Sequence, residues 1–232
     1  MTQPVAVVVG AGPGLGAAVA RRFAAAGLAV ALARRRPEEL SGLAAEIGGK
    51  AYACDAAERD SVEALFAAID KDLGGPQVVV YNAGAYQPGG ILEIEAADFE
   101  RCWRIGCLGG FHVGQAAAKR MVAAGAGTII FTGATASLRG SAKFVNLAVP
   151  KFGLRALAQS MARDLGPRGV HVAHAIIDGQ IAGERPSHSA EARGPDAVLA
   201  PEAIAEAYYQ LHAQPRSAWT QELDLRPCME KF

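Results

Sequence analysis

The 232-residue sequence predicts an α/β fold, in which a seven-stranded parallel sheet is doubly wound with helices on both faces. Short β-branched runs alternate with longer alanine-rich stretches, the pattern of repeated β-α-β units. The β-branched runs are apolar throughout, as in Val78-Val79-Val80, and such strands suit a sheet that is covered on both faces. Right-handed crossovers between these strands give the doubly wound topology.

The alternation places each element in order along the chain. Strands are expected at 4–9, 28–33, 50–53, 77–81, 127–132, 170–177 and 219–224. Helices are expected at 14–26, 37–47, 59–72, 95–123, 141–165 and 201–213. The polar stretch 183–200 has Pro and Gly near both ends, so we expect a mobile lid or connector within a single domain over 1–232.

Charge and composition exclude several classes of protein. The chain has 23 basic and 23 acidic residues, so no basic field points to nucleic acid. Its apolar runs are interrupted within about ten residues, which is too short to span a membrane. Residues 1–4 lead directly into the first strand without a basic leader, so we expect a cytoplasmic protein. The four cysteines lack the spacing of a metal site, and no metal is expected: they are Cys54, Cys102, Cys107 and Cys228.

A glycine-rich turn follows the first strand and opens the first helix. It reads Gly10-Ala11-Gly12-Pro13-Gly14-Leu15-Gly16. Glycines at such a turn let the backbone approach a pyrophosphate, whose charge then faces the helix N-terminal amides. The spacing departs from G-x-G-x-x-G, because Leu15 falls where that pattern has its third glycine. The strand–turn–helix context still predicts a dinucleotide site, since a mere tight turn does not require this many glycines.

Three arginines, Arg34, Arg35 and Arg36, come directly after the second strand. A site for NAD has an acidic residue here to bind the ribose 2′-hydroxyl, whereas guanidinium groups can bind a 2′-phosphate. The alternative is a solvated basic start to the next helix, which the helix dipole opposes unless an anion compensates. The sequence therefore favours NADP over NAD.

Small and polar residues follow the third and fourth strands. Asp55 comes after the third, and Asn82-Ala83-Gly84 comes after the fourth. Taken singly, Asp55 is typical of a helix cap and Asn82 of a turn. Together, at the carboxyl ends of neighbouring strands, they predict contacts with a cofactor ribose.

With these motifs, the chain resembles the short-chain dehydrogenase/reductase family over essentially its whole length. Further matching segments are RIGCLGGF at 104–111, GTIIFTG at 127–133, Lys151, and GVHV at 169–172. The resemblance implies a Rossmann-type fold and an NAD(P)-dependent oxidoreductase of small carbonyls, alcohols or enones, usually a dimer or tetramer. It places the glycines at the pyrophosphate, Arg35 at the 2′-phosphate, Asp55 at the adenine and Lys151 at the nicotinamide ribose. The expected cofactor-binding set is Gly10, Gly12, Gly14, Leu15, Gly16, Arg34, Arg35, Asp55, Asn82, Ala83, Gly84, Lys151, Gly179 and Ile181.

The proton-handling positions depart from that family. Its helix asparagine falls on Gly106, its serine on Ala134 and its tyrosine on Leu147. The separation from Ala134 to Leu147 matches the family's serine-to-tyrosine spacing, which argues against an alignment slip. Lys151 remains, as the ribose-binding member of the catalytic set. The usual Pro-Gly after the sixth strand is here Asp178-Gly179.

Several side chains are candidates for a substitute proton donor. Asp178 is the sharpest, because burial can keep a carboxyl group protonated near the nicotinamide. Its alternative is a turn residue that hydrogen-bonds the backbone. Thr135 lies beside the former serine position, as does Ser137. The remaining candidates at the edge of the pocket are Tyr81, Tyr86 and Asn146.

Three functions fit this pattern. The first is an NADPH-dependent oxidoreductase that reduces a small carbonyl, imine or activated C=C substrate with a non-standard proton donor. The second is a catalytically silent NADP-binding sensor or assembly protein, and the third is non-redox chemistry, such as isomerisation, in an apolar pocket. In each case we expect a small-molecule ligand and a homodimer or homotetramer, joined through the long alanine-rich helices at 95–123 and 141–165.

Overall fold

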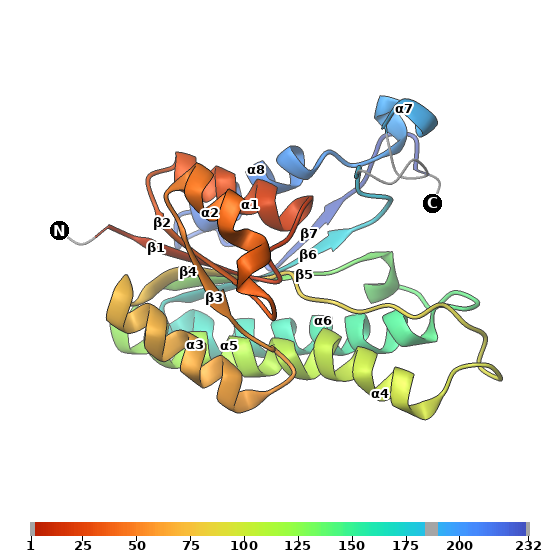
Figure 1. The fold of residues 1–232 in the computed structure, drawn as a ribbon, viewed down its shortest axis with the longest axis horizontal. Coiled ribbons are helices and arrows are strands. Elements are labelled where there is room, and N and C mark those ends of the chain that lie inside the picture. Colours follow the sequence, from red (N-terminus) through yellow and green to blue (C-terminus); the bar gives the residue numbers. More distant parts are fainter. Residues whose placement is uncertain (1–2, 184–189, 231–232) are drawn as a thin grey trace.

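The computed structural model describes residues 3–183 and 190–230 and confirms a doubly wound α/β fold (Figure 1). Its seven strands are all parallel and lie in the order β3-β2-β1-β4-β5-β6-β7. They are β1 (Val5–Val9), β2 (Ala29–Arg34), β3 (Lys50–Ala53), β4 (Pro76–Tyr81), β5 (Gly127–Thr132), β6 (Val170–Ile177) and β7 (Glu222–Leu225). The chain reverses direction across the sheet between β1 and β4, which is where open α/β sheets bind ligands.

Two helical layers cover the sheet. The α-helices are α1 (Leu15–Ala25), α2 (Ser41–Ile47), α3 (Arg59–Asp72), α4 (Ala96–Trp103), α5 (Gly109–Ala124), α6 (Val145–Leu165), α7 (Ala190–Arg193) and α8 (Pro201–His212). Helices α1, α2 and α8 lie on one face, and α3, α4, α5 and α6 lie on the other (Figure 1). Because both faces are covered, the sheet's side chains are buried on both sides.

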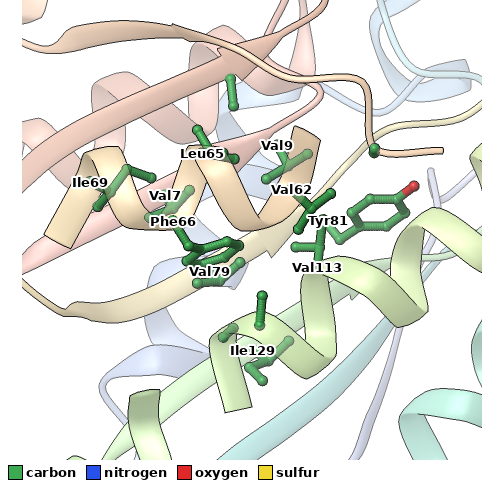
Figure 2. Packing of buried hydrophobic residues seen from close by; sticks show 14 of the residues in the cluster. Val7, Val9, Val62, Leu65, Phe66, Ile69, Val79, Tyr81, Val113 and Ile129 are labelled. Carbon is green, nitrogen blue, oxygen red and sulfur yellow. The ribbon is translucent and has the colours of Figure 1, made fainter. Parts of the chain in front are cut away.

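Strand β1 is apolar at every position because its alternate residues enter two separate cores. Val7 and Val79 belong to the cluster beneath α3 and α5, where Phe66 and Ile69 of α3 pack against them (Figure 2). Val8 belongs to the opposite cluster, with residues of α1 and α8. Each of these side chains is almost fully buried, and each contributes about 1.5–3 kcal/mol of hydrophobic free energy.

The helix expected at 95–123 is interrupted. Between α4 and α5 the chain forms one turn of π-helix, η2 (Arg104–Leu108). This wider turn leaves the Ile105 carbonyl oxygen able to accept a hydrogen bond from the Tyr81 hydroxyl. Such π turns are common at functional sites, and this one lies beside the ends of β1 and β4.

The stretch 183–200 lies partly outside the described residues, since 184–189 are not among them. Of the rest, α7 is a single helical turn, and Ile181 forms an isolated parallel bridge with Leu199. Its mobility and lid function stay predictions. Within 3–183 and 190–230, every helix is too short or too polar to cross a membrane.

Candidate active site

Glycines shape the turn between β1 and α1 at two points where a side chain would not fit. Gly10 has a φ of +87°, and a Cβ there would lie 2.5 Å from the Ala83 backbone nitrogen. A Cβ at Gly16 would lie 2.9 Å from the Gly10 carbonyl oxygen. Gly16 therefore allows the close helix–strand packing that the third glycine of G-x-G-x-x-G usually provides, and Leu15 is free to be a buried core residue.

Open space lies on the other side of the same turn. A Cβ at Gly14 would meet no described heavy atom within 4 Å, although the φ of +90° there still favours glycine. Gly14 is the N-cap of α1, so the first-turn N–H groups of the helix have no intrahelical acceptor. Those amides and the helix dipole are suited to an anionic group.

The three arginines after β2 are not equivalent. Glu39 bridges two of them, with its carboxylate oxygens 2.5 Å from Arg34 Nη2 and 2.7 Å from Arg36 Nε. Within the described ranges, Arg35 has no hydrogen-bond or ion-pair partner. Arg35 therefore has all its guanidinium donors available, and it is the side chain that the sequence singles out for a 2′-phosphate.

A cavity of about 350 Å³ lies at the carboxyl ends of β1, β2, β3 and β4. Its walls bring together eight residues that the sequence predicts to bind cofactor: Gly10, Gly12, Arg34, Arg35, Asp55, Asn82, Ala83 and Gly84. Asn82 ties two of the strand ends together, because its Nδ2 donates to the Gly10 carbonyl oxygen at 3.2 Å. A Cβ at Gly84 would meet no described atom within 4 Å, so the missing side chain leaves room for a ligand. A nucleotide fits this set of residues, and its binding stays a prediction.

Two residues that reach the cavity wall from the helical layer were not predicted from the sequence. Arg101 and Ile105 reach it from α4 and η2, in the helical layer beneath the sheet. Their separation of one helical turn puts them on one face of a helix, but nothing in the sequence shows that this face lies under the end of β3.

Six residues of the expected cofactor set do not line this cavity: three lie at the start of α1 (Gly14, Leu15 and Gly16), and three lie towards β5 and β6. Gly179 has a φ of +145°, and a Cβ there would lie 2.7 Å from the ring of Pro227. Ile181 pairs with Leu199. Lys151 lies on α6, where its side chain is buried.

The three positions to which the resemblance assigns the family's proton-handling residues have no polar side chain. Ala134 follows β5, and Leu147 lies half-buried in the first turn of α6. Gly106 is buried in η2, where a Cβ would lie 2.8 Å from Cβ of Pro150. The proline ring thus fills the space that an asparagine side chain would need, so the packing of Pro150 favours glycine at position 106.

Lys151 is held at the end of β5. Its Nζ donates to the Thr132 carbonyl oxygen at 2.6 Å, and burial lowers its pKa to about 8. An ammonium group has three donors, and Thr132 takes one of them. The other two remain for ligand hydroxyl groups or water, in keeping with the expected ribose contact.

Asp178 does not have the setting of a proton donor. The Thr135 hydroxyl donates to its Oδ1 at 2.5 Å, and Arg226 Nη2 lies 2.9 Å from its Oδ2. Both carboxylate oxygens are therefore engaged, one of them by a cation. These bonds join the ends of β5, β6 and β7 and argue against a proton-donor role for Asp178 or Thr135, which stays a prediction.

The two pocket tyrosines are engaged as well. Tyr81 is fully buried, and its hydroxyl donates to Ile105, while burial raises its pKa. The Tyr86 hydroxyl donates to the Lys143 carbonyl oxygen at 3.3 Å, and its ring stacks on Phe144 with centroids 5.0 Å apart. These contacts give both side chains structural roles.

Asn146 and Ser137 are buried and bonded within the protein. Asn146 Nδ2 donates to the Gln87 carbonyl oxygen at 3.3 Å, so it holds the segment after β4 against α6. Ser137 Oγ accepts from the Ala134 N–H at 3.1 Å and lies 3.4 Å from His174 Nε2. Burial lowers the pKa of His174 to about 4, so this ring is neutral near pH 7. Each candidate for a substitute proton donor thus makes at least one hydrogen bond within the protein, while Oδ1 of Asn146 is buried without a partner among the described residues.

Comparison with known proteins adds three findings. A family model of short chain dehydrogenases matches residues 4–185. D-threitol dehydrogenase of Mycolicibacterium smegmatis is 32% identical over 173 residues, which span 72% of this chain and 66% of that protein.

Two solved structures are similar over nearly the whole chain. A short-chain dehydrogenase from Rhodopseudomonas palustris is 43% identical, with a TM-score of 0.83 over 97% of this chain and 98% of that one. A metagenomic short-chain oxidoreductase in complex with NADP is 28% identical, with a TM-score of 0.84 over 99% of both chains.

Proposed function

Because the chain belongs to the short-chain dehydrogenase/reductase family, we propose that it is an oxidoreductase that binds NADP(H) in the cavity at the ends of β1 and β4. The observation that carries this proposal is the cavity itself. The glycine turn at Gly10 and Gly12, the Asn82 strand end and Arg35 line one space of a size suited to the adenosine part of a dinucleotide.

The arginines support NADP over NAD. The end of β2 has guanidinium groups where an NAD site has a carboxylate. Glu39 is near, but it is bonded to Arg34 and Arg36 and does not line the cavity. A similar chain was solved with NADP. Hydrogen bonds from Arg35 to a 2′-phosphate are charge-assisted and would favour NADPH.

The proposed reaction needs no acidic side chain. A nicotinamide bound there would supply hydride, which an iminium carbon can accept to give an amine without a further proton. In an activated C=C bond, hydride adds to the β-carbon and the resulting enolate takes its proton from solvent. The protein's own part is to bind and orient: Lys151 holds a ribose hydroxyl, while Ala134 and Leu147 offer an apolar surface to the substrate.

The test is a screen of NADPH consumption with imines, enones, enals and small ketones. We expect turnover of the iminium or enone class and little reduction of unactivated ketones. A matched variant, Ala134→Ser with Leu147→Tyr, restores two of the three proton-handling positions. It should raise ketone reduction by about 10²–10⁴-fold, the usual contribution of a positioned acid. Absence of turnover with every class in both proteins counts against the proposal.

A second candidate is a protein that binds NADP(H) without chemistry. The observation that favours it is the engagement of Asp178, Tyr81 and Tyr86 by other groups. It predicts tight NADPH binding, flat absorbance traces with all substrates, and a biological role that survives the Ala134→Ser/Leu147→Tyr change.

We also propose that the chain forms a homo-oligomer through α5 and α6. A groove between these helices has an apolar floor with Leu157 and Met161, and Phe111 at its edge is 42% exposed. Lys119, Asp164 and Arg168 border it, so both signs of charge are present. A two-fold contact can therefore bury the apolar surface and pair opposite charges.

A further inference from the structure

The helical layer contributes a fourth arginine to the cofactor cavity. Arg34, Arg35 and Arg36 enter from the end of β2, whereas Arg101 enters from α4. Arg101 and Ile105 lie four residues apart and both line the cavity, so they share one face of this helix.

Arg101 lies at the end of the cavity next to β3. The segment after that strand, Cys54 to Ala56, lines the same cavity. Arg104, on the same helix, anchors it to this segment, because its Nη2 lies 2.9 Å from Glu58 and 3.4 Å from the Ala57 carbonyl oxygen. Ile105, Cys54 and Ala56 give this end apolar walls, which suit a nucleobase better than a phosphate.

One side-chain contact orients the guanidinium of Arg101 and leaves most of its hydrogen-bond donors available. Asp98, one turn earlier on α4, accepts from its Nη2 at 2.8 Å. That bond fixes the direction of the planar group and leaves its face and its remaining N–H donors free for a ligand. An arginine plane stacks well on aromatic rings, nucleobases included.

We infer that Arg101 is a cofactor-binding residue that stacks on the adenine ring, while the arginines after β2 bind the phosphate. This inference rests on the proposed function, since it assigns a residue to the same nucleotide site. It gives the two arginine groups separate tasks: Arg101 recognises any adenine dinucleotide, and Arg35 distinguishes NADPH from NADH.

Calorimetric titration of NADPH and of NADH tests whether Arg101 and Arg35 bind different parts of the cofactor. Four proteins are compared: the wild type, Arg101→Gln, Arg35→Gln and Arg163→Gln. Arg101→Gln should weaken both cofactors by the same factor, about two- to ten-fold. Arg35→Gln should weaken NADPH by about ten- to a hundred-fold and leave NADH unchanged. Arg163→Gln removes an exposed charge from α6, remote from the cavity, and should change neither.

A conservative variant separates stacking from charge. Arg101→Lys keeps the cation and loses the plane, so we expect an affinity between those of the wild type and Arg101→Gln for both cofactors. Equal affinity of the wild type and Arg101→Gln, or a loss confined to NADPH, overturns the inference while leaving NADP binding intact. A wild-type protein that binds neither cofactor overturns the proposed function, and the inference with it. Should Arg101→Gln not fold, Arg101→Lys decides by the same criteria.

Discussion

Gly106 and Pro150 share one space between η2 and α6, and each limits what the other can be. The proline lies inside a helix, where it removes a backbone donor and is normally costly. Its ring fills the volume beside the glycine, which a side chain would otherwise occupy. The glycine at position 106 is therefore built into the packing, whereas Leu147 is half-buried.

Restoring the asparagine alone should destabilise the protein. In Gly106→Asn the new Cβ meets the proline ring at 2.8 Å, and overpacking of this kind costs about 1–3 kcal/mol. Adding Pro150→Gly should recover part of that loss, since it removes both the ring and the Cβ that the new side chain meets. Urea unfolding of the two single variants and the double variant measures the coupling. Additive free energies would mean that the two residues do not compete for space.

The ionisation of Lys151 makes the free energy of unfolding depend on pH. Its pKa is about 8 in the folded chain, below its ordinary 10.5, because burial disfavours the charge. Between these values the unfolded chain holds a proton that the folded chain has released, so folding stability rises with pH in this window. Below pH 8 both states are protonated, and the buried charge remains a constant cost.

Comparison with Lys151→Met isolates this effect. From pH 8 to pH 10 the stability of the wild type should rise relative to the variant, by up to ~3 kcal/mol. The tyrosines whose pKa burial raises, Tyr81 and Tyr208, contribute equally to both proteins and cancel. Urea denaturation at three pH values in this range gives the result. A constant difference would show that Lys151 titrates normally.

At the scale of elements, α6 contacts β7, the edge strand of the sheet, through the carboxylate of Glu222. Arg155 and Gln159, one turn apart on α6, both donate to Glu222 of β7. The Arg155 guanidinium, with help from Gln159, lowers the pKa of Glu222 to about 2. This strand has only four residues, so the contact is a large part of what fixes it.

The contact of Glu222 with Arg155 and Gln159 should be lost in acid. Because the folded pKa of Glu222 lies below its ordinary 4.5, its stabilisation is present above about pH 4.5 and is lost as pH falls through 2. Glu222→Gln should therefore unfold with a shallower acid dependence than the wild type, measured by circular dichroism. Glu191→Gln, an exposed carboxylate on α7, serves as the charge-matched control. Identical acid profiles for wild type and Glu222→Gln would exclude this role.

Elements bounded by local signals could be predicted closely from the sequence. The ranges 50–53, 59–72, 127–132 and 170–177 agree with β3, α3, β5 and β6 because glycine, proline or polar residues mark their ends. Strand β7 begins at Glu222, later than the expected 219. Trp219 has a high strand propensity, but its ring stacks on His171 at 5.0 Å instead of extending the strand.

Tertiary contacts explain what the sequence missed. The π turn at η2 depends on Tyr81 and Pro150, which come from other elements. The sequence made Asp178 a candidate proton donor because it does not show that Arg226, which follows β7 in the chain, forms an ion pair with this carboxylate. Likewise, Arg101 joins the cavity only through the packing of α4 under β3.

At the scale of the whole molecule, the groove between α5 and α6 leaves apolar surface uncovered. Phe111 is 42% exposed at its edge, and α6 exposes Phe152 to the same extent. A second copy of the chain, related by a two-fold axis, would cover both aromatic rings and bring the groove's opposite charges together. The cofactor cavity lies at the carboxyl edge of β1 to β4 and is lined without residues of α5 or of α6, although Lys151 of the expected cofactor set lies on α6.

Phe111→Glu should therefore dissociate the assembly without abolishing nucleotide binding. A charge placed in the contact is repelled by its symmetry mate and has no apolar surface left to bury. Light scattering after size exclusion should give a smaller mass for this variant than for the wild type, with NADPH affinity within about two-fold of it. Leu92→Glu is the control, because Leu92 is 97% exposed but lies in the loop after β4, away from the groove. An unchanged mass in Phe111→Glu, or an equal loss of mass in Leu92→Glu, would place the subunit contact elsewhere.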